Sequence, residues 1–130
     1  MDKNDKVAYW LDLSSYDLKT AKVMLEGERF LYVGFMCHQV IEKALKGIIS
    51  SVSPEQPPYT HNLTILAKSA GIYKLFNEDQ LDLIDTLEPL NIQARYPISK
   101  ERLLESLTKE RCLIIYSKTE ELLKWIKRRL

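Results

Sequence analysis

The segment that most constrains the fold covers residues 28–51, where apolar side chains recur at helical spacing. On a helical wheel they fill a broad arc that consists of Val33, Cys37, Val40, Ile41, Ala44, Leu45 and Ile48. The remaining sector is polar and contains Gln39, Glu42, Lys43 and Lys46, with Phe35 among them and His38 at the boundary. The segment therefore predicts a long amphipathic helix with a polar strip along one side.

This polar strip brings several kinds of chemistry onto one side of the helix. His38, Glu42 and Lys46 are spaced four residues apart, so they climb the same side. Gln39 and Lys43 form a second pair of this spacing beside them. An imidazole, a carboxylate, an amide and two ammonium groups suit a polar ligand. They also suit a solvated face with helix-stabilising pairs, and spacing alone leaves both interpretations open.

The first helix is expected over residues 5–26 and carries two apolar stripes. One stripe consists of Val7, Trp10, Leu11, Ser14, Leu18, Ala21 and Leu25, and the other of Tyr9, Leu13, Tyr16, Thr20 and Val23. A helix with two such stripes packs on two neighbours. The second neighbour is either another helix of this chain or a partner subunit.

Two shorter helices are expected after the proline-rich linker at residues 53–59, because proline withholds a backbone donor and disfavours helix at the preceding residue. Thr60 is expected to cap the first of them, over residues 61–70. Asn77 with Gln80 resembles a capping box, which predicts the start of the second.

The last helix is expected to run unbroken over residues 99–129, after an irregular stretch at 91–97. Arg111 and Lys118 fall inside its apolar arc, where a charge must be paired or reach solvent. We expect Arg111 to pair with an acid on another helix, for example Glu42, or to line a polar cleft. No strand-like alternation is found anywhere. The chain of 130 residues is therefore expected to be one all-α domain, an up-and-down bundle of four to five antiparallel helices.

Charge narrows the range of partners. Nineteen basic and eighteen acidic residues give a net charge of +1, so there is no overall electrostatic footprint for DNA or RNA. A local cluster at the end of the chain contains Lys124, Lys127, Arg128 and Arg129. It is either an RNA patch or a complement to the negative end of the last helix, so RNA stays open as a partner that net charge does not indicate.

Cysteine content and hydropathy suggest the compartment. Cys37 and Cys112 are too few for a disulfide framework and are expected to be buried free thiols in a reducing cytosol. Together with the two histidines they lack zinc-ligand spacing, so neither a metal nor a cofactor is expected. The longest apolar run, residues 30–37, is too short to span a bilayer, and no signal-type segment follows the first residues. We expect a cytoplasmic protein without a membrane segment.

Four short motifs occur in a characteristic order. They are Trp10, His38-Gln39-x-x-Glu42-Lys43-x-x-Lys46, Thr60-His61-x-Leu63 and Ala94-Arg95-Tyr96-Pro97. In this order and spacing the chain resembles HEPN domains (higher eukaryotes and prokaryotes nucleotide-binding). The resemblance implies a compact helical bundle that is commonly homodimeric. Many prokaryotic members accompany a separate minimal nucleotidyltransferase and were suggested to bind nucleotide or substrate for it, whereas others are metal-independent ribonucleases that act as toxins or in phage defence.

The resemblance also implies a nucleotide site that consists of His38, Glu42, Lys43, Lys46, His61, Arg95 and Tyr96. In such a site Lys46 and Arg95 would contact phosphate. Tyr96 or Phe35 would stack on a base, and Glu42 would accept from a ribose hydroxyl. His61, near a helix start, would help to hold an anion.

The chain departs from the ribonuclease pattern of the family, in which a histidine follows the arginine by four to six residues. No histidine follows Arg95 at any distance, so no catalytic residue is expected. We therefore expect a nucleotide- or substrate-binding accessory subunit that acts with a minimal nucleotidyltransferase in a toxin–antitoxin or defence-like pair. The alternatives are a ribonuclease that uses His38 or His61 instead, and a purely structural dimeric interaction module.

Overall fold

The computed structural model describes residues 1–94, 96 and 100–130, and every regular element among them is helical. Along the chain the elements are α1 (Lys3–Glu26), α2 (Phe30–Val52), α3 (Leu63–Ser69), the 3₁₀ helix η1 (Tyr73–Leu75), α4 (Glu78–Gln93), α5 (Lys100–Ser106) and α6 (Lys109–Lys127). The prediction of an all-α bundle is confirmed. Arg95, one of the expected site residues, lies outside the described residues.

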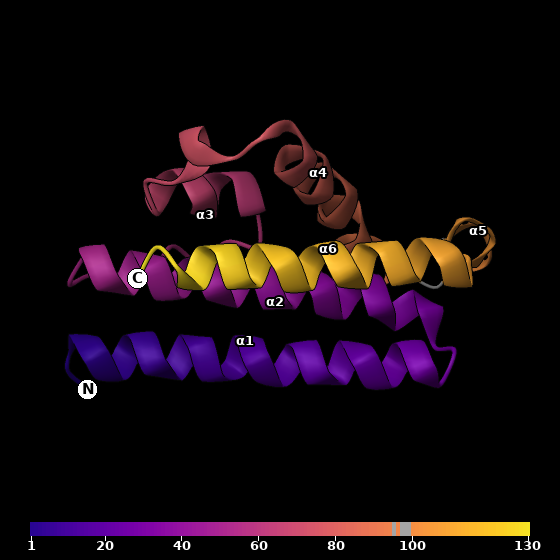
Figure 1. Cartoon of the computed structure of the whole chain (residues 1–130), viewed down its shortest axis with the longest axis horizontal. Coiled ribbons are helices and arrows are strands. Elements are labelled where there is room, and N and C mark those ends of the chain that lie inside the picture. The colour runs from indigo at the N-terminus through magenta and orange to yellow at the C-terminus, as the bar shows by residue number, and fades with distance from the viewer. Residues whose placement is uncertain (95, 97–99) are drawn as a thin grey trace.

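The long helices α1, α2 and α6 lie alongside one another, and α3 and α4 lie on the side of α2 and α6 that is away from α1 (Figure 1). The chain runs out along α1, back along α2, out again through α3 and α4, and back along α6 (Figure 1). Helix α2 is central because it packs against α1, α3, α4, α5 and α6. Its polar strip is consequently surrounded by other elements.

The core explains why α2 has so broad an apolar arc. Its arc residues Val33, Val40, Ile41 and Leu45 are fully buried against apolar side chains of the other helices. Gly34 allows α4 to approach closely, because a Cβ at this position would lie 2.5 Å from Leu90 Cδ1. The geometry of the α2–α4 contact therefore depends on a residue without a side chain.

Both cysteines are free and buried, as the sequence predicts. Burial raises the pKa of the Cys37 thiol to about 12, since the interior disfavours a thiolate. Cys112 is also buried, and its pKa is raised for the same reason. Both side chains behave as small apolar groups of the core.

The expectation of one unbroken last helix is wrong, because the segment divides into α5 and α6. The hydroxyl of Thr108 accepts from the backbone N–H of Arg111 at 3.2 Å and so caps a new helix. The Arg111 guanidinium donates to the carbonyl and the hydroxyl of Ser106, at 3.3 and 3.2 Å, and the expected pairing with Glu42 is also wrong. Lys118 is exposed and does not belong to the buried arc.

The expected caps of the shorter helices are partly confirmed. Asn77 and Gln80 form the predicted capping box, in which each side-chain oxygen accepts from the other residue's backbone N–H, at 2.8 and 2.9 Å. Thr60 does not cap α3. Asn62 does so instead, because its carboxamide oxygen accepts from Ile65 N at 2.9 Å.

The two stripes of α1 have different surroundings. The first faces the core, where Ser14, Ala21 and Leu25 are buried. On the second stripe Tyr9, Tyr16 and Val23 are exposed. No helix among the described residues is long and apolar enough to cross a membrane.

Candidate functional site

The polar strip of α2 is centred on Glu42, which is only 3% exposed. The Lys46 ammonium donates to Glu42 Oε2 at 3.0 Å, one helical turn further along α2. The Nδ1 atom of His61, from the loop before α3, lies 2.8 Å from Glu42 Oε1. A buried carboxylate thus joins two nitrogen donors from different parts of the chain, which is the satisfied arrangement that burial of a charge requires.

The position of His61 follows from how α3 begins. Asn62 caps the helix, and the carboxylate of Glu88 on α4 accepts from the backbone N–H of Leu63. A carboxylate at a helix N-terminus is favourable because the first backbone N–H groups have no partner within the helix. These contacts attach the start of α3 to α4 and bring the His61 ring to Glu42.

Glu88 lies in an unfavourable environment for a carboxylate. Partial burial raises the pKa of its carboxyl group, and hydrogen bonds from the backbone N–H groups of Leu63 and Thr64 oppose that rise. The negative charges of Glu42 and Asp85 add to the rise. The site therefore contains two carboxylates that repel each other.

His38 lies between these two carboxylates and is completely buried. Its Nδ1 is 3.7 Å from Glu42 Oε1, and its Nε2 is 3.9 Å from Glu88 Oε2. Both distances are longer than a hydrogen bond. Each contact is an ion pair only when the imidazole is protonated. The arrangement places His38 in the interior rather than at the surface of the site.

Lys43 and Gln39 connect α2 to its neighbours. The Lys43 ammonium forms an ion pair with the buried carboxylate of Asp17 on α1. The Gln39 amide donates to Asn91 Oδ1 on α4 at 3.0 Å. Lys43 thus connects α2 to α1, and Gln39 connects α2 to α4, and neither contact involves Glu42.

The surface side of the Glu42 cluster includes an aromatic ring. Lys46 Nζ lies 5.4 Å from the centroid of the Trp10 ring, which is within the range of a cation–π contact. The His61 side chain is 57% exposed, whereas that of Lys46 is 13% exposed. Trp10, Lys46 and His61 are therefore the members of the cluster that a ligand would meet first.

The structure brings together four of the seven predicted site residues, namely His38, Glu42, Lys46 and His61. Lys43 is directed to Asp17. Tyr96 is exposed just beyond the end of α4. Whether these residues bind a nucleotide stays a prediction, and for Arg95 the geometry lies outside the described residues.

Sequence reasoning missed the partners on other helices, which are Asp17, Glu88 and Asn91. A signal was present in α4, where Glu88 and Asn91 are three residues apart and so share one side of the helix. Within the described residues, no group of three or more His, Cys, Asp and Glu side chains could hold a metal ion.

Comparison with known proteins gives one match. The model of the HEPN domain family matches residues 7–130, which is nearly the whole chain. No curated protein matches, and no solved structure matches.

Proposed function

The chain belongs to the HEPN domain family, and from this premise we propose that it is an accessory subunit without catalysis of its own. The family consists of nucleotide-binding or ribonuclease-like helical modules. In our proposal this member binds a nucleotide, or a substrate that contains one, for a separate minimal nucleotidyltransferase. The pair would act in a toxin–antitoxin or defence-like system.

The proposal rests on the contacts of the buried Glu42 carboxylate, which accepts from Lys46 Nζ and lies against Nδ1 of His61. Glu42 takes up Nδ1 of His61 and leaves Nε2 of the exposed ring for a ligand. A phosphate oxygen would accept from this nitrogen in its protonated form and from Lys46 Nζ, since an ammonium has three donors. The Trp10 ring beside Lys46 offers an aromatic surface to a base.

Calorimetric titration of ATP into the purified protein tests the binding step. We expect saturable heat in the wild type and weaker binding in Lys46→Ala and His61→Ala. Lys74→Ala removes an exposed lysine of η1 and serves as the matched control. Tryptophan fluorescence gives a second measurement of the same binding. The chain has two tryptophans, so in Trp125→Phe the fluorescence comes from Trp10 alone and reports on this site. Absence of heat in the wild type, alone and with the nucleotidyltransferase, would refute the nucleotide part.

The outer face of α1 supports a homodimer. Tyr9, Tyr16 and Val23 are 48%, 70% and 62% exposed, and they recur every seven residues as in a helix–helix seam. We propose that a second copy of the chain covers this face. Sedimentation velocity should show a dimer that Tyr16→Asp converts to a monomer, and a wild-type monomer at micromolar concentration would contradict this part.

One observation favours the ribonuclease alternative. The Glu42–His61 contact fixes one ring nitrogen of a surface imidazole, and this is the arrangement of a carboxylate-supported general base. If this alternative holds, labelled RNA is cleaved by the wild type, and cleavage is lost in both His61→Ala and Glu42→Gln. Equal cleavage by all three proteins would identify a contaminating nuclease.

A further inference from the structure

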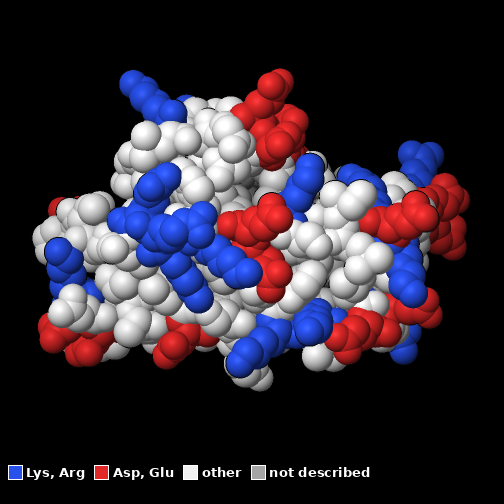
Figure 2. Space-filling model, viewed as in Figure 1, with Lys and Arg blue, Asp and Glu red and all other residues white. Residues whose placement is uncertain are grey.

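The basic end of the chain has no role in the site described above. Lysine and arginine side chains gather over the C-terminal half of α6 and the adjoining part of α1 (Figure 2). Those of α6 and its end include Lys118, Lys124, Lys127, Arg128 and Arg129. Basic side chains at this position complement the negative end of α6. Two hollows also lie beside this half of the helix, one on each side, and these basic side chains contribute to their lining.

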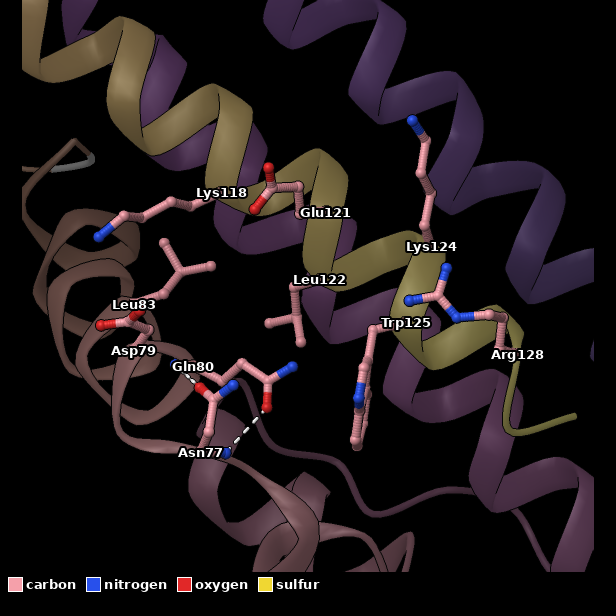
Figure 3. A pocket seen from close by; sticks show the side chains of 10 residues that line it. All are labelled: Asn77, Asp79, Gln80, Leu83, Lys118, Glu121, Leu122, Lys124, Trp125 and Arg128. Atoms are coloured by element: carbon pink, nitrogen blue, oxygen red, sulfur yellow. Dashed lines mark hydrogen bonds between the residues drawn. The ribbon is translucent and has the colours of Figure 1, made fainter.

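The first hollow lies between the start of α4 and α6 and has a volume of about 360 Å³. In Figure 3, Leu83 lies on the α4 side of this hollow, and Leu122 and Trp125 lie on the α6 side. Lys118 reaches from α6 toward α4 (Figure 3). This volume is in the range of small-ligand sites, and an indole beside cations suits a planar base that is attached to a phosphate.

The side-chain hydrogen-bond donors around this hollow are not used by contacts within the described part of the protein. The capping box uses the side-chain oxygens of Asn77 and Gln80, so both amide NH₂ groups remain as donors (Figure 3). Among the described residues, Lys118, Lys124 and Arg128 form no ion pair and no side-chain hydrogen bond. Groups of this kind, kept in water beside a hollow, are ready to bind an anion without breaking an internal contact.

The second hollow lies on the other side of α6, against α1, and has a volume of about 350 Å³. Lys19 and Lys22 of α1, Lys127 and the ring of Tyr116 contribute to its lining. Lys124 lines both hollows, and in Figure 3 it points away from the first, across α6 toward α1. The two hollows are therefore parts of one track.

The charge of this track differs from that of the whole chain. The two hollows are lined by six cations, Lys19, Lys22, Lys118, Lys124, Lys127 and Arg128, and by three carboxylates, Asp79, Glu120 and Glu121. Their difference is +3, whereas the chain as a whole has +1. The guanidinium of Arg129 lies over the Trp125 ring, 4.1 Å from its centroid. It adds to the positive charge of the track, and a base that stacks on this face of the ring must displace it.

We propose that this track binds single-stranded RNA, independently of the function proposed above. The phosphate backbone would cross α6 at Lys124, with one base in the first hollow on Trp125 and another in the second hollow on Tyr116. Alternation of cations with aromatic rings is how proteins bind single strands without reading their sequence. Asp79 and Glu121 accept hydrogen bonds, so they suit ribose 2′-hydroxyl groups and base amines.

The test measures the fluorescence anisotropy of a labelled oligouridylate of about twelve nucleotides at low salt. Lys124→Glu should weaken binding by about tenfold or more, because it reverses the charge shared by both hollows. Lys100→Glu makes the same charge reversal at an exposed lysine of α5, which lines neither hollow, and should change affinity by less than about twofold. In a Trp10→Phe background, RNA should quench the remaining fluorescence of Trp125. Circular dichroism and urea unfolding establish that each variant is folded.

The salt dependence of RNA binding is a second test of the same phosphate contacts. The slope of log affinity against log salt should fall in magnitude by about 0.7 in Lys124→Ala, the value for one phosphate contact of a single strand. Equal weakening by Lys100→Glu and Lys124→Glu would overturn the track, as would the absence of RNA binding. Competition by polyglutamate as effective as that by RNA would indicate an acidic protein partner. Full competition by AMP at equal phosphate concentration would indicate a mononucleotide site instead.

The proposed nucleotide site and the RNA track can be tested separately. Lys46→Ala should leave RNA affinity unchanged, and Lys124→Glu should leave the heat of ATP binding unchanged. A loss of both activities in either variant would contradict two independent sites.

Discussion

The polar strip of α2 and the basic track of α6 have similar residue types but use them in different ways. On the strip, Glu42, Lys43 and Gln39 lie at helix contacts and are bonded to other side chains of the protein. On the track, Lys118, Lys124 and Arg128 remain in water without a side-chain partner among the described residues. Buried polar groups must be paired, whereas exposed ones are satisfied by solvent. Charges of the strip therefore stabilise the fold, and charges of the track are available to a ligand.

This difference has a consequence for how a ligand would bind at each site. At the strip, a phosphate must share Lys46 with the Glu42 carboxylate, and only the exposed His61 ring is free on one side. Binding there is expected to be weakened by this competition, because the Lys46 ammonium that would meet a phosphate already donates to Glu42. At the track, Lys118, Lys124 and Arg128 have no internal contact to give up among the described residues, whereas Lys127 donates to the Ser15 hydroxyl at 3.0 Å and Arg129 lies over the Trp125 ring. Affinity there is expected to follow ionic strength.

Removal of one carboxylate from each region gives the largest expected contrast. Glu42→Ala should lower the free energy of unfolding by about 2–3 kcal/mol, because it leaves the largely buried Lys46 without its acceptor and removes the contact that holds His61 to α2. Glu121→Ala, at the rim of the hollow, should change it by less than about 0.5 kcal/mol. Urea unfolding of both variants at pH 7 measures the difference. Equal effects would mean that the strip is no more structural than the surface.

The two buried glycines of α2 sharpen the comparison, since one supports the strip and the other does not. Gly34→Ala should destabilise by about 1–2 kcal/mol, because the new methyl group would meet Leu90 at 2.5 Å and push α4 away from the Gln39–Asn91 hydrogen bond. Gly47→Ala meets its neighbours only at 3.5 Å or more and should stabilise by about 0.5–1 kcal/mol through helix propensity. Thermal and urea unfolding test these opposite signs. A neutral Gly34→Ala would show that Leu90 moves aside at little cost.

Helical periodicity was sufficient to predict the class and most of the elements. The patterns over residues 5–26 and 28–51 correspond to α1 (Lys3–Glu26) and α2 (Phe30–Val52), because each apolar arc really faces the core. The division between α5 and α6 was missed, since a single threonine cap interrupts an otherwise continuous pattern. Local hydrogen bonding thus outweighs a long-range periodicity at this point.

The candidate site was predictable only where its contacts are local. The Glu42–Lys46 pair follows from i, i+4 spacing on one helix. The partners Asp17 and Asn91 come from helices whose rotation about their own axes the sequence does not define. The basic cluster was visible as composition, but the hollow needs Trp125 and Gln80 to meet across two helices, which only tertiary packing decides.

The smallest expected effect concerns Glu88, which supports the strip from α4. Its pKa is raised in the fold, chiefly by burial, so the folded protein holds the proton more tightly than the unfolded chain. A group of this kind contributes stability that is present below its unfolded pKa of about 4.3 and is lost as pH rises through the folded pKa. Glu88→Gln keeps a neutral acceptor for Leu63 N at every pH. It should therefore match the wild type near pH 4 and exceed it near pH 7, by less than about 1 kcal/mol because the side chain is 28% exposed. Paired urea titrations at the two pH values measure this difference, with Asp82→Asn, an exposed carboxyl of the same helix, as the control. If Glu88→Gln is instead the less stable protein at pH 7, the attraction of the ionised carboxylate for His38 and the start of α3 outweighs its burial, and the strip is held together by charge as well as by hydrogen bonds.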